Sequence, residues 1–124
     1  MKDEIFISRI VPNIYSNDLE KSKIFYGSFL NMKIVMDHGW VITFASFKNP
    51  LAQVNILDNQ GKPALDNARI FLSVEVSDVN KMYKKAKEAH MEIVYPITDE
   101  AWGVRRFFVK DPNGATINLV AHKS

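Results

Sequence analysis

Residues 101–120, AWGVRRFFVKDPNGATINLV, hold several side chains that could do chemistry. Two adjacent arginines, Arg105 and Arg106, lie in an apolar run and could stabilise a developing negative charge. Trp102 could stack on a planar ligand, and the residues 111–114, DPNG, are typical of a turn. Whether this stretch catalyses a reaction or only shapes a pocket depends on the elements that carry it.

Other reactive groups are few. His38, His90 and His122 fall in a turn, at a helix end and in the C-terminal tail, where exposed polar residues are usual. They have no HxxxH or HExxH spacing, and there is no glycine-rich phosphate loop or nucleophile elbow. The chain has no cysteine, which excludes disulfides, thiolate metal ligands and a cysteine nucleophile.

The bulk properties limit the partners. A net charge of +2 is too small to indicate a nucleic-acid partner. No apolar run approaches the roughly 18 residues needed to cross a membrane. The charged N-terminus also lacks the apolar core of a signal peptide. We therefore expect a cytoplasmic protein without nucleic-acid or membrane partners.

The structural elements that position these side chains come from an internal repeat of the sequence. Several segments recur at offsets of 59 to 63 residues: RIVPNIYSNDLEKS (9–22) and RIFLSVEVSDVNKM (69–82), MKIV (32–35) and MEIV (91–94), AQVNIL (52–57) and ATINLV (115–120). Such a repeat predicts two copies of one structural unit. We place module one at residues 5–58, a linker at 59–68 and module two at 69–121, all within a single domain over residues 1–124.

Each module is predicted to contain a strand, a helix and three further strands. The helices begin at Asn17 or Asp18 and at Ser77 or Asp78, which can cap them. The predicted strands are 8–15, 32–37, 40–47 and 52–58, then 69–76, 92–96, 103–110 and 114–121. The inner helical stripes are Leu19, Ile24, Phe25, Phe29 and Leu30, then Val79, Met82, Tyr83 and Ala86. Packing between sheet and helix is expected for Phe44, Phe47, Phe107 and Phe108.

A tandem βαβββ repeat with a DLEKSKIFY helix (18–26) and a WGVRRFFVKDPNGATINL ending (102–119) resembles the vicinal-oxygen-chelate superfamily. That superfamily includes glyoxalases, extradiol dioxygenases, fosfomycin-modifying enzymes and bleomycin-resistance proteins. The resemblance covers about residues 5–121. It implies an α+β fold in which two βαβββ modules form a curved mixed sheet around a cavity.

The resemblance also implies where a metal would bind. In the metal-dependent members, His and Glu side chains on the inner faces of the first and last strands hold a divalent ion. Here those positions fall on Val11 and Phe71, and on Asn55 and Asn118. Valine and phenylalanine cannot ligate a metal, and a neutral amide replaces a carboxylate poorly. We therefore expect no metal and no other cofactor, as in the metal-free, bleomycin-resistance-like branch.

Strand alternation predicts what lines the cavity. If Val11 and Phe71 face inward, so do Glu75 and several polar neighbours. Each inward asparagine either bonds to neighbouring groups or grips a ligand, and each tryptophan either packs or stacks on one. The predicted ligand-binding residues are Asn13, Tyr15, Trp40, Asn55, Ser73, Glu75, Trp102, Arg105 and Asn118.

Glu75 is the only carboxylate expected inside the cavity, and Arg105 is its natural partner because an isolated buried carboxylate is costly. Arg106 should then point the other way, toward solvent or the helix layer. Glu75 could be part of an internal ion pair, open to solvent, a general base, or an anchor for a cationic ligand.

Two main functions follow from these residues. The first is a homodimeric binding protein that sequesters a planar or hydrophobic drug or metabolite, as in antibiotic resistance. A cationic, bleomycin-type ligand suits this slightly basic chain poorly. The alternative is a lyase, isomerase or dioxygenase-like enzyme with an unusual metal or none. Its catalytic candidates are Glu75 as acid or base, and Arg105 or Arg106 as oxyanion stabiliser. A third possibility is a standalone domain that binds a regulatory metabolite.

Overall fold

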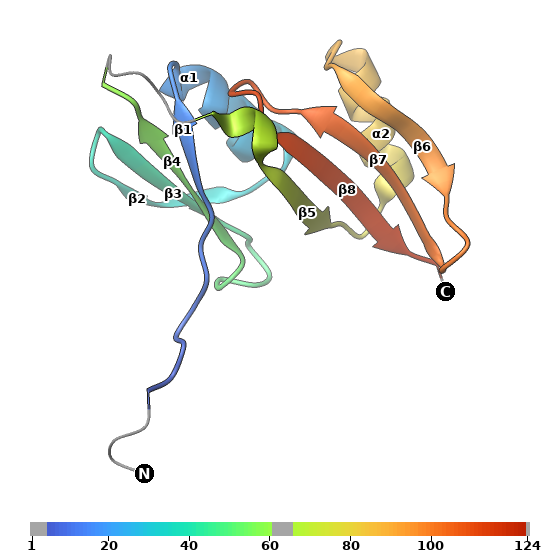
Figure 1. The fold of residues 1–124 in the computed structure, drawn as a ribbon, viewed down its shortest axis with the longest axis horizontal. Coiled ribbons are helices and arrows are strands. Elements are labelled where there is room, and N and C mark those ends of the chain that lie inside the picture. Colours follow the sequence, from blue (N-terminus) through green and yellow to red (C-terminus); the bar gives the residue numbers. More distant parts are fainter. Residues whose placement is uncertain (1–4, 61–65, 124) are drawn as a thin grey trace.

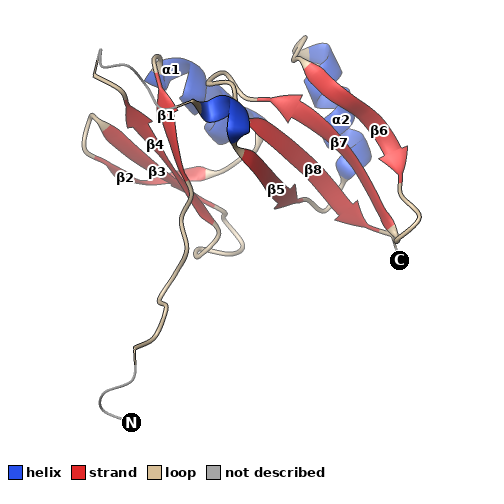
Figure 2. Ribbon diagram, viewed as in Figure 1, coloured by secondary structure: helices blue, strands red, loops and turns tan. Residues whose placement is uncertain are grey.

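The computed structural model describes residues 5–60 and 66–123, which form two four-stranded sheets (Figures 1 and 2). The first sheet has the order β1 (Asn13–Ser16), β4 (Gln53–Asp58), β3 (Val41–Ala45), β2 (Lys33–Asp37). The second has the order β5 (Phe71–Glu75), β8 (Thr116–His122), β7 (Val104–Lys110), β6 (Ile93–Asp99). In each sheet the first pair is parallel and the other two are antiparallel. This duplicated order confirms the α+β fold and the two predicted βαβββ modules.

One helical segment accompanies each sheet. Module one has α1 (Leu19–Ser22), which continues as the π-helical segment η1 (Lys23–Phe29). Module two has α2 (Val79–Glu88), preceded by a short 3₁₀ turn, η2 (Asn67–Arg69). Asp18 and Asp78 accept hydrogen bonds from backbone amides in the first turns of α1 and α2, as the sequence predicts for N-caps. Within the described residues, no helix combines the length and apolar character that a membrane crossing needs.

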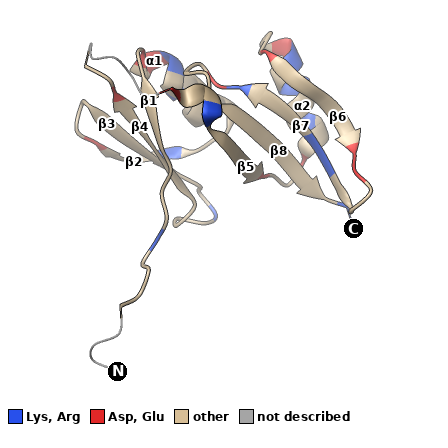
Figure 3. Ribbon diagram, in the orientation of Figure 1, with Lys and Arg blue, Asp and Glu red and all other residues tan. Residues whose placement is uncertain are grey.

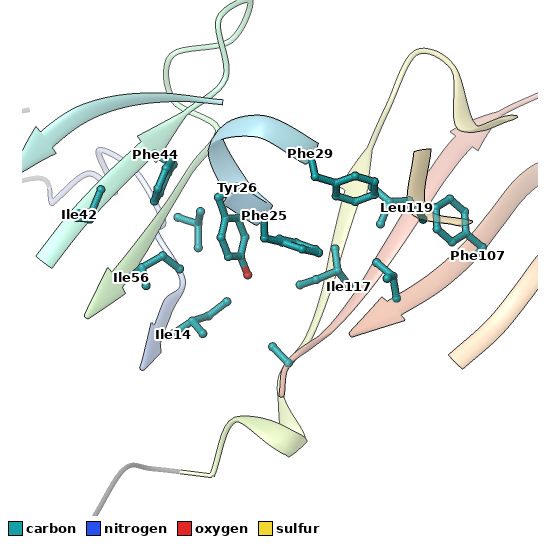
Figure 4. Packing of buried hydrophobic residues seen from close by; sticks show 14 of the residues in the cluster. Ile14, Phe25, Tyr26, Phe29, Ile42, Phe44, Ile56, Phe107, Ile117 and Leu119 are labelled. Atoms are coloured by element: carbon teal, nitrogen blue, oxygen red, sulfur yellow. The ribbon is translucent and has the colours of Figure 1, made fainter. Parts of the chain in front are cut away.

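The first helical segment lies between the two sheets and joins their cores (Figure 4). Tyr26 is fully buried and packs with Phe44 of β3, with ring centroids 5.8 Å apart. Phe25 and Phe29 extend the same cluster toward Ile117 of β8. The two modules therefore share one continuous hydrophobic core instead of folding around separate ones.

The predicted inner stripe of the first helix is wrong at one position. Ile24 is 63% exposed, whereas Tyr26, which the stripe omits, is completely buried. The cause is the π-helical winding, in which the Leu30 N–H donates to the Phe25 carbonyl five residues earlier. The wider turn changes which side chains share a face, so a count based on 3.6 residues per turn fails here. The stripe of the second helix is confirmed, because Val79, Met82, Tyr83 and Ala86 all belong to the core cluster or pack against it.

Other predicted boundaries also need correction. Strand β1 begins at Asn13 instead of residue 8, and the chain before it runs away from the sheet (Figure 1). Of the four phenylalanines expected between sheet and helix, Phe44 and Phe107 are fully buried there. Phe47 is mostly exposed, and Phe108 lies on the opposite face of its sheet. The predicted linker, 59–68, lies in part outside the described residues, at 61–65.

A buried hydrogen bond fastens the first helical segment to the turn that the sequence marks as DPNG. The Tyr26 hydroxyl donates to Asp111 Oδ2 over 2.6 Å. Burial, together with the adjacent Asp111 carboxylate, raises the pKa of the Tyr26 phenol well above its ordinary value. Both effects disfavour the phenolate, because its charge would lie in a low-dielectric interior next to another negative group.

This raised pKa predicts a loss of stability at alkaline pH. In the unfolded chain Tyr26 releases its proton near pH 10, whereas in the folded chain it keeps it to higher pH. The contribution of Tyr26 to the free energy of unfolding is therefore complete below about pH 10. Above that pH it falls by about 1.4 kcal/mol per pH unit until the folded pKa is reached. Urea unfolding measures the free energy of unfolding of wild type and of Tyr26→Phe between pH 8 and 11.5. The difference between the two proteins should become smaller above pH 10. A gap that stays constant or widens would contradict the assignment.

Candidate ligand-binding faces

Each sheet has one face that packs against the helices and one that is turned away from them. Cross-strand pairing assigns side chains to these outer faces, because directly paired residues point to the same side. On the first sheet Asn13, Asn55 and Thr43 lie in one row, and we call this side the first open face. The second open face carries Phe71, Ser73, Glu75, Arg106, Phe108 and Asn118. The alternation predicted for Asn13, Asn55, Ser73, Glu75 and Asn118 is therefore confirmed.

The first open face contains a closed row of hydrogen bonds. Thr43 Oγ1 donates to Asn55 Oδ1 over 2.6 Å. Asn55 Nδ2 in turn donates to Asn13 Oδ1 over 2.9 Å. The carbonyl and one amide hydrogen of Asn55 are thus used within the sheet, so this asparagine bonds to its neighbours.

The equivalent row on the second open face is incomplete. Asn118 Nδ2 donates to Ser73 Oγ over 3.0 Å, which reproduces the contact between Asn55 and Asn13. The place of Thr43 is taken by Phe108, which is paired with Asn118 across the strands and has no hydroxyl to donate. Asn118 Oδ1 is consequently buried without a hydrogen-bond partner within the described residues. An unpaired buried acceptor costs about 1–3 kcal/mol, and a donor that reached this oxygen once the covering side chains moved aside would recover that energy.

Four aromatic residues lie on or beside the face that carries Asn118 and form what we call the aromatic platform: Phe71, Tyr95, Trp102 and Phe108. The ring of Phe108 lies 4.9 Å from that of Phe71 and 4.7 Å from that of Tyr95. Phe71 and Trp102 are 57% and 66% exposed, so solvent reaches both side chains. Strand β8, which carries Asn118 through the middle of this region, has no Lys, Arg, Asp or Glu (Figure 3).

Arg106 holds the platform together. Its guanidinium carbon lies 4.9 Å from the centre of the Phe108 ring and 5.1 Å from that of Trp102. Glu100 Oε2 accepts from Arg106 Nε over 2.7 Å and from the Tyr95 hydroxyl over 3.0 Å. The cation is therefore fixed by a carboxylate and by the ring faces, which orients the rings before any ligand arrives.

The predicted orientation of the two arginines is wrong. Arg106 lies on the open face, whereas Arg105 lies on the helix side. There Arg105 donates to Asn80 Oδ1 of α2 over 2.8 Å and to Asp99 Oδ1 over 3.0 Å. The hydrogen bond from Arg105 is the main cause that lowers the pKa of Asp99. The sequence already held the information for this assignment. The DPNG turn joins two antiparallel strands, and counting residues outward from it pairs Asn118 with Phe108. Arg106, two residues before Phe108, therefore lies on the same face as Asn118.

Of the alternatives left open for Glu75, the structure shows a side chain open to solvent. It is mostly exposed at the end of the second open face, and its Oε2 lies 3.2 Å from His122 Nδ1. It is neither buried nor paired with Arg105. The pair expected to do acid–base chemistry is therefore divided between opposite faces of the sheet.

The structure brings some predicted ligand-binding residues together and separates others. Ser73, Trp102 and Asn118 meet on or beside the second open face, joined by residues that the prediction left out: Phe71, Tyr95, Glu100, Arg106 and Phe108. Asn13, Tyr15 and Asn55 belong to the first sheet, and the half-exposed Trp40 lies in the β2–β3 turn. No hydrogen bond joins the two open faces within the described residues.

The positions where the resemblance implies metal ligands do not fit a divalent ion. Val11 and Phe71 carry no donor atoms, and the Asn55 carbonyl already accepts from Thr43. Asn118 would offer a single neutral oxygen. Across residues 5–60 and 66–123, no three His, Asp or Glu side chains gather closely enough to hold a metal. The donor set at these faces therefore suits hydrogen bonding better than coordination.

Comparisons with known proteins place this fold. The sequence profile of the Glyoxalase/Bleomycin resistance protein/Dioxygenase superfamily matches residues 7–119. No curated protein matches the chain. Among solved structures, TioX from Micromonospora sp. ML1 is similar with a TM-score of 0.76 and 19% identity, over 93% of this chain and 98% of that one. A protein of unknown function from Agrobacterium tumefaciens str. C58 has a TM-score of 0.71 and 23% identity, over 96% and 95%. A glyoxalase/dioxygenase from Nostoc punctiforme has 0.78 and 14%, over 92% and 90%.

Proposed function

The chain belongs to the glyoxalase/bleomycin resistance protein/dioxygenase superfamily, and from this premise we propose that it binds a planar, hydrophobic small molecule carrying a hydrogen-bond donor. The unpaired, buried Asn118 Oδ1 beside the exposed aromatic platform carries the proposal. Pockets for small molecules combine apolar walls with a few polar groups that orient the ligand. The second open face has this composition.

The proposed ligand uses two kinds of contact. Its flat ring system stacks on the exposed rings of Phe71 and Trp102, which contributes about 0.5–1.5 kcal/mol per ring pair beyond the area buried. Its N–H or O–H donates to Asn118 Oδ1 and removes the cost of the unpaired acceptor. Arg106 is fixed by Glu100 and serves to hold the platform instead of attracting an anionic ligand.

The contact with Asn118 predicts a requirement for a donor on the ligand. A suitable panel contains fused-ring heteroaromatics with a ring N–H, each paired with its N-methyl analogue. We expect the N–H compounds to raise the melting temperature of the protein and the N-methyl compounds to have a much smaller effect. Asn118→Leu should raise the dissociation constant of an N–H compound by about 10- to 100-fold, which corresponds to a loss of about 1.4–2.7 kcal/mol of binding free energy.

Asn55→Leu is the matched control, because Asn55 occupies the equivalent place on the first open face and its carbonyl is already paired. This variant should retain the affinity of the wild type, measured by titration calorimetry. Equal binding of N–H and N-methyl partners, or an Asn118→Leu protein that binds like wild type, would refute the role of the unpaired oxygen. A panel that never shifts the melting temperature would refute the platform as a binding site.

The enzymatic alternative has no observation of its own in its favour. It would assign acid–base chemistry to Glu75 with Arg105, but these two side chains lie on opposite faces of the second sheet. Drug sequestration and metabolite binding, in contrast, would use the same contacts at Asn118 and the platform. The panel should therefore contain compounds of both classes.

A further inference from the structure

The DPNG turn contains the one Asn–Gly pair of the sequence, Asn113–Gly114. In such a pair the backbone nitrogen of the glycine can attack the side-chain carbonyl carbon of the asparagine, because glycine has no Cβ to hinder a close approach. Every other asparagine of the sequence precedes a residue that carries a side chain. Asn113 is therefore the asparagine whose local sequence most favours spontaneous deamidation.

This reaction needs no enzyme, metal or oxidant, because both reacting groups belong to the same short segment of chain. A bond forms between the Gly114 nitrogen and Asn113 Cγ, and the bond from Cγ to Nδ2 breaks. The proton of the Gly114 nitrogen leaves with the amide group as ammonia, which gives a cyclic succinimide. Water then opens the ring at one or the other of its carbonyl carbons. The product is aspartate or isoaspartate, each with a negative charge in place of the neutral amide.

The turn leaves the attacking nitrogen accessible. Asn113 and Gly114 are only partly buried, and they line a cavity of about 480 Å³ beside the start of α1. Gly114 has a φ of +91°, which glycine adopts without strain. Its N–H donates to the Asp111 carbonyl over 3.3 Å, a long hydrogen bond for these atoms. The backbone of the turn therefore does little to restrain the Gly114 nitrogen.

The side chain of Asn113, in contrast, is held by module one. Asn113 Nδ2 donates to Ser22 Oγ on α1 over 3.1 Å and to Asp111 Oδ2 over 3.4 Å. Ser22 is fully buried, and Ser16 Oγ lies 3.0 Å from its hydroxyl. Attack by the Gly114 nitrogen requires the Asn113 amide to rotate toward its own backbone, and this rotation breaks its bond to Ser22. The contact with Ser22 therefore opposes the reaction.

We propose that Asn113 is a site of spontaneous deamidation guarded by Ser22, so that the reaction proceeds only after the DPNG turn separates from α1. The reacting pair lies in module two and its guard in module one, 91 residues earlier. Local openings of this kind occur in folded proteins without global unfolding. The chemical state of Asn113 therefore records whether the modules have separated at this junction.

Deamidation also prevents the junction from closing again. The new carboxylate has no N–H to donate to Ser22 or to Asp111. It places a further negative charge beside the buried Asp111 carboxylate, and like charges repel strongly at so short a distance. Isoaspartate in addition lengthens the backbone by a methylene group and displaces the Asn113 carbonyl, which accepts from Asn67 Nδ2 over 3.0 Å. Because Asp111 holds Tyr26, the modified turn loses its fit to module one.

The first test measures the rate of deamidation at Asn113 in mildly alkaline buffer. Trypsin releases a peptide that begins at Asp111, and fragmentation mass spectrometry shows which asparagine in it has reacted. We expect the folded wild type to react about tenfold or more slowly than the same protein unfolded in urea. Equal rates in the two states would overturn protection by the fold. An Asn113 that does not react in urea would overturn the site itself.

Ser22→Ala tests the guard. This variant removes the acceptor of the Asn113 amide and should speed deamidation of the folded protein about threefold or more. Ser16→Ala is the matched control, because Ser16 is buried in the same cluster but has no hydrogen bond to Asn113 within the described residues. If Ser22→Ala does not fold, Ser22→Cys provides the same comparison with a much weaker hydrogen-bonding group. A Ser22 variant that reacts no faster than Ser16→Ala would overturn the role of Ser22.

The second test measures the consequence for the junction. Protein deamidated at Asn113 is separated from unmodified protein by ion exchange, and its urea midpoint should be about 1 M lower. Asn31→Asp adds the same charge at an exposed asparagine and should keep nearly the wild-type midpoint. A deamidated protein as stable as the wild type would show that the turn docks again and would overturn this part of the proposal. Neither test uses a ligand, so both outcomes are independent of the proposed binding function.

Discussion

Replacing Asp111 with alanine is expected to lower the free energy of unfolding by about 3–5 kcal/mol. The Asp111 carboxylate is almost fully buried. It accepts from the Tyr26 hydroxyl over 2.6 Å and from the backbone amides of Asn113 and Ala115 over 2.8 and 2.9 Å. Removing it leaves several buried donors unpaired at once, and each costs about 1–3 kcal/mol where water cannot replace the carboxylate.

This loss should exceed that of an ordinary turn residue, because the contact with Tyr26 also joins the two modules. Asp37→Ala is the control: Asp37 ends β2 beside a tight turn of module one, is exposed, and accepts only from the Gly39 amide within the described residues. Its loss should cost about 1 kcal/mol or less. Urea unfolding followed by circular dichroism measures both values. Similar losses for the two variants would show that the Asp111 network contributes little.

Phe107→Ala is expected to cost about 3–5 kcal/mol of unfolding free energy, whereas Phe108→Ala should cost far less. Phe107 is fully buried on the helix side, with its ring 4.9 Å from that of Tyr83 on α2. Its removal leaves a cavity that the sheet and helix cannot close. Phe108 is only partly buried on the second open face, so water and its ring neighbours can fill the space it leaves.

The same pair of variants separates stability from binding. Phe108→Ala removes the centre of the aromatic platform and should weaken the binding of an N–H heteroaromatic about tenfold or more. Phe107→Ala, measured at a temperature where it remains folded, should bind with nearly the affinity of wild type. Thermal unfolding measures the stability of each variant, and calorimetric titration measures its affinity for the ligand. Equal stability losses, or unchanged affinity in Phe108→Ala, would contradict the assignment of faces.

Local signals in the sequence were sufficient for the architecture. The repeated segments, the capping residues Asp18 and Asp78 and the DPNG turn predict the order of strands and helices that the structure shows. Alternation along a strand also placed Ser73, Glu75 and Asn118 on one face. These features depend on neighbours in the chain, so they can be read without knowing the contacts across the molecule.

Features set by contacts between distant residues were predicted less well. The π-helical turn that buries Tyr26 and exposes Ile24 is stabilised by packing between two sheets, which no helical period reveals. The exchange of roles between Arg105 and Arg106 follows from the pairing of β7 with β8 and from Asn80 on α2. Glu75 contacts His122 through its carboxylate because the end of β8 lies beside the end of β5.

By itself, the sequence determined that this protein is a duplicated βαβββ unit, and its resemblance to a known family implied that two asparagines stand where metal ligands would be expected. Only the tertiary structure decided that the two asparagines differ: Asn55 receives a hydrogen bond from Thr43, and Asn118 faces Phe108 and keeps an unpaired oxygen. The physical reason is that hydrogen bonding is a property of pairs. A residue type shows what an atom can donate or accept, and only the neighbouring strands show whether a partner is within reach.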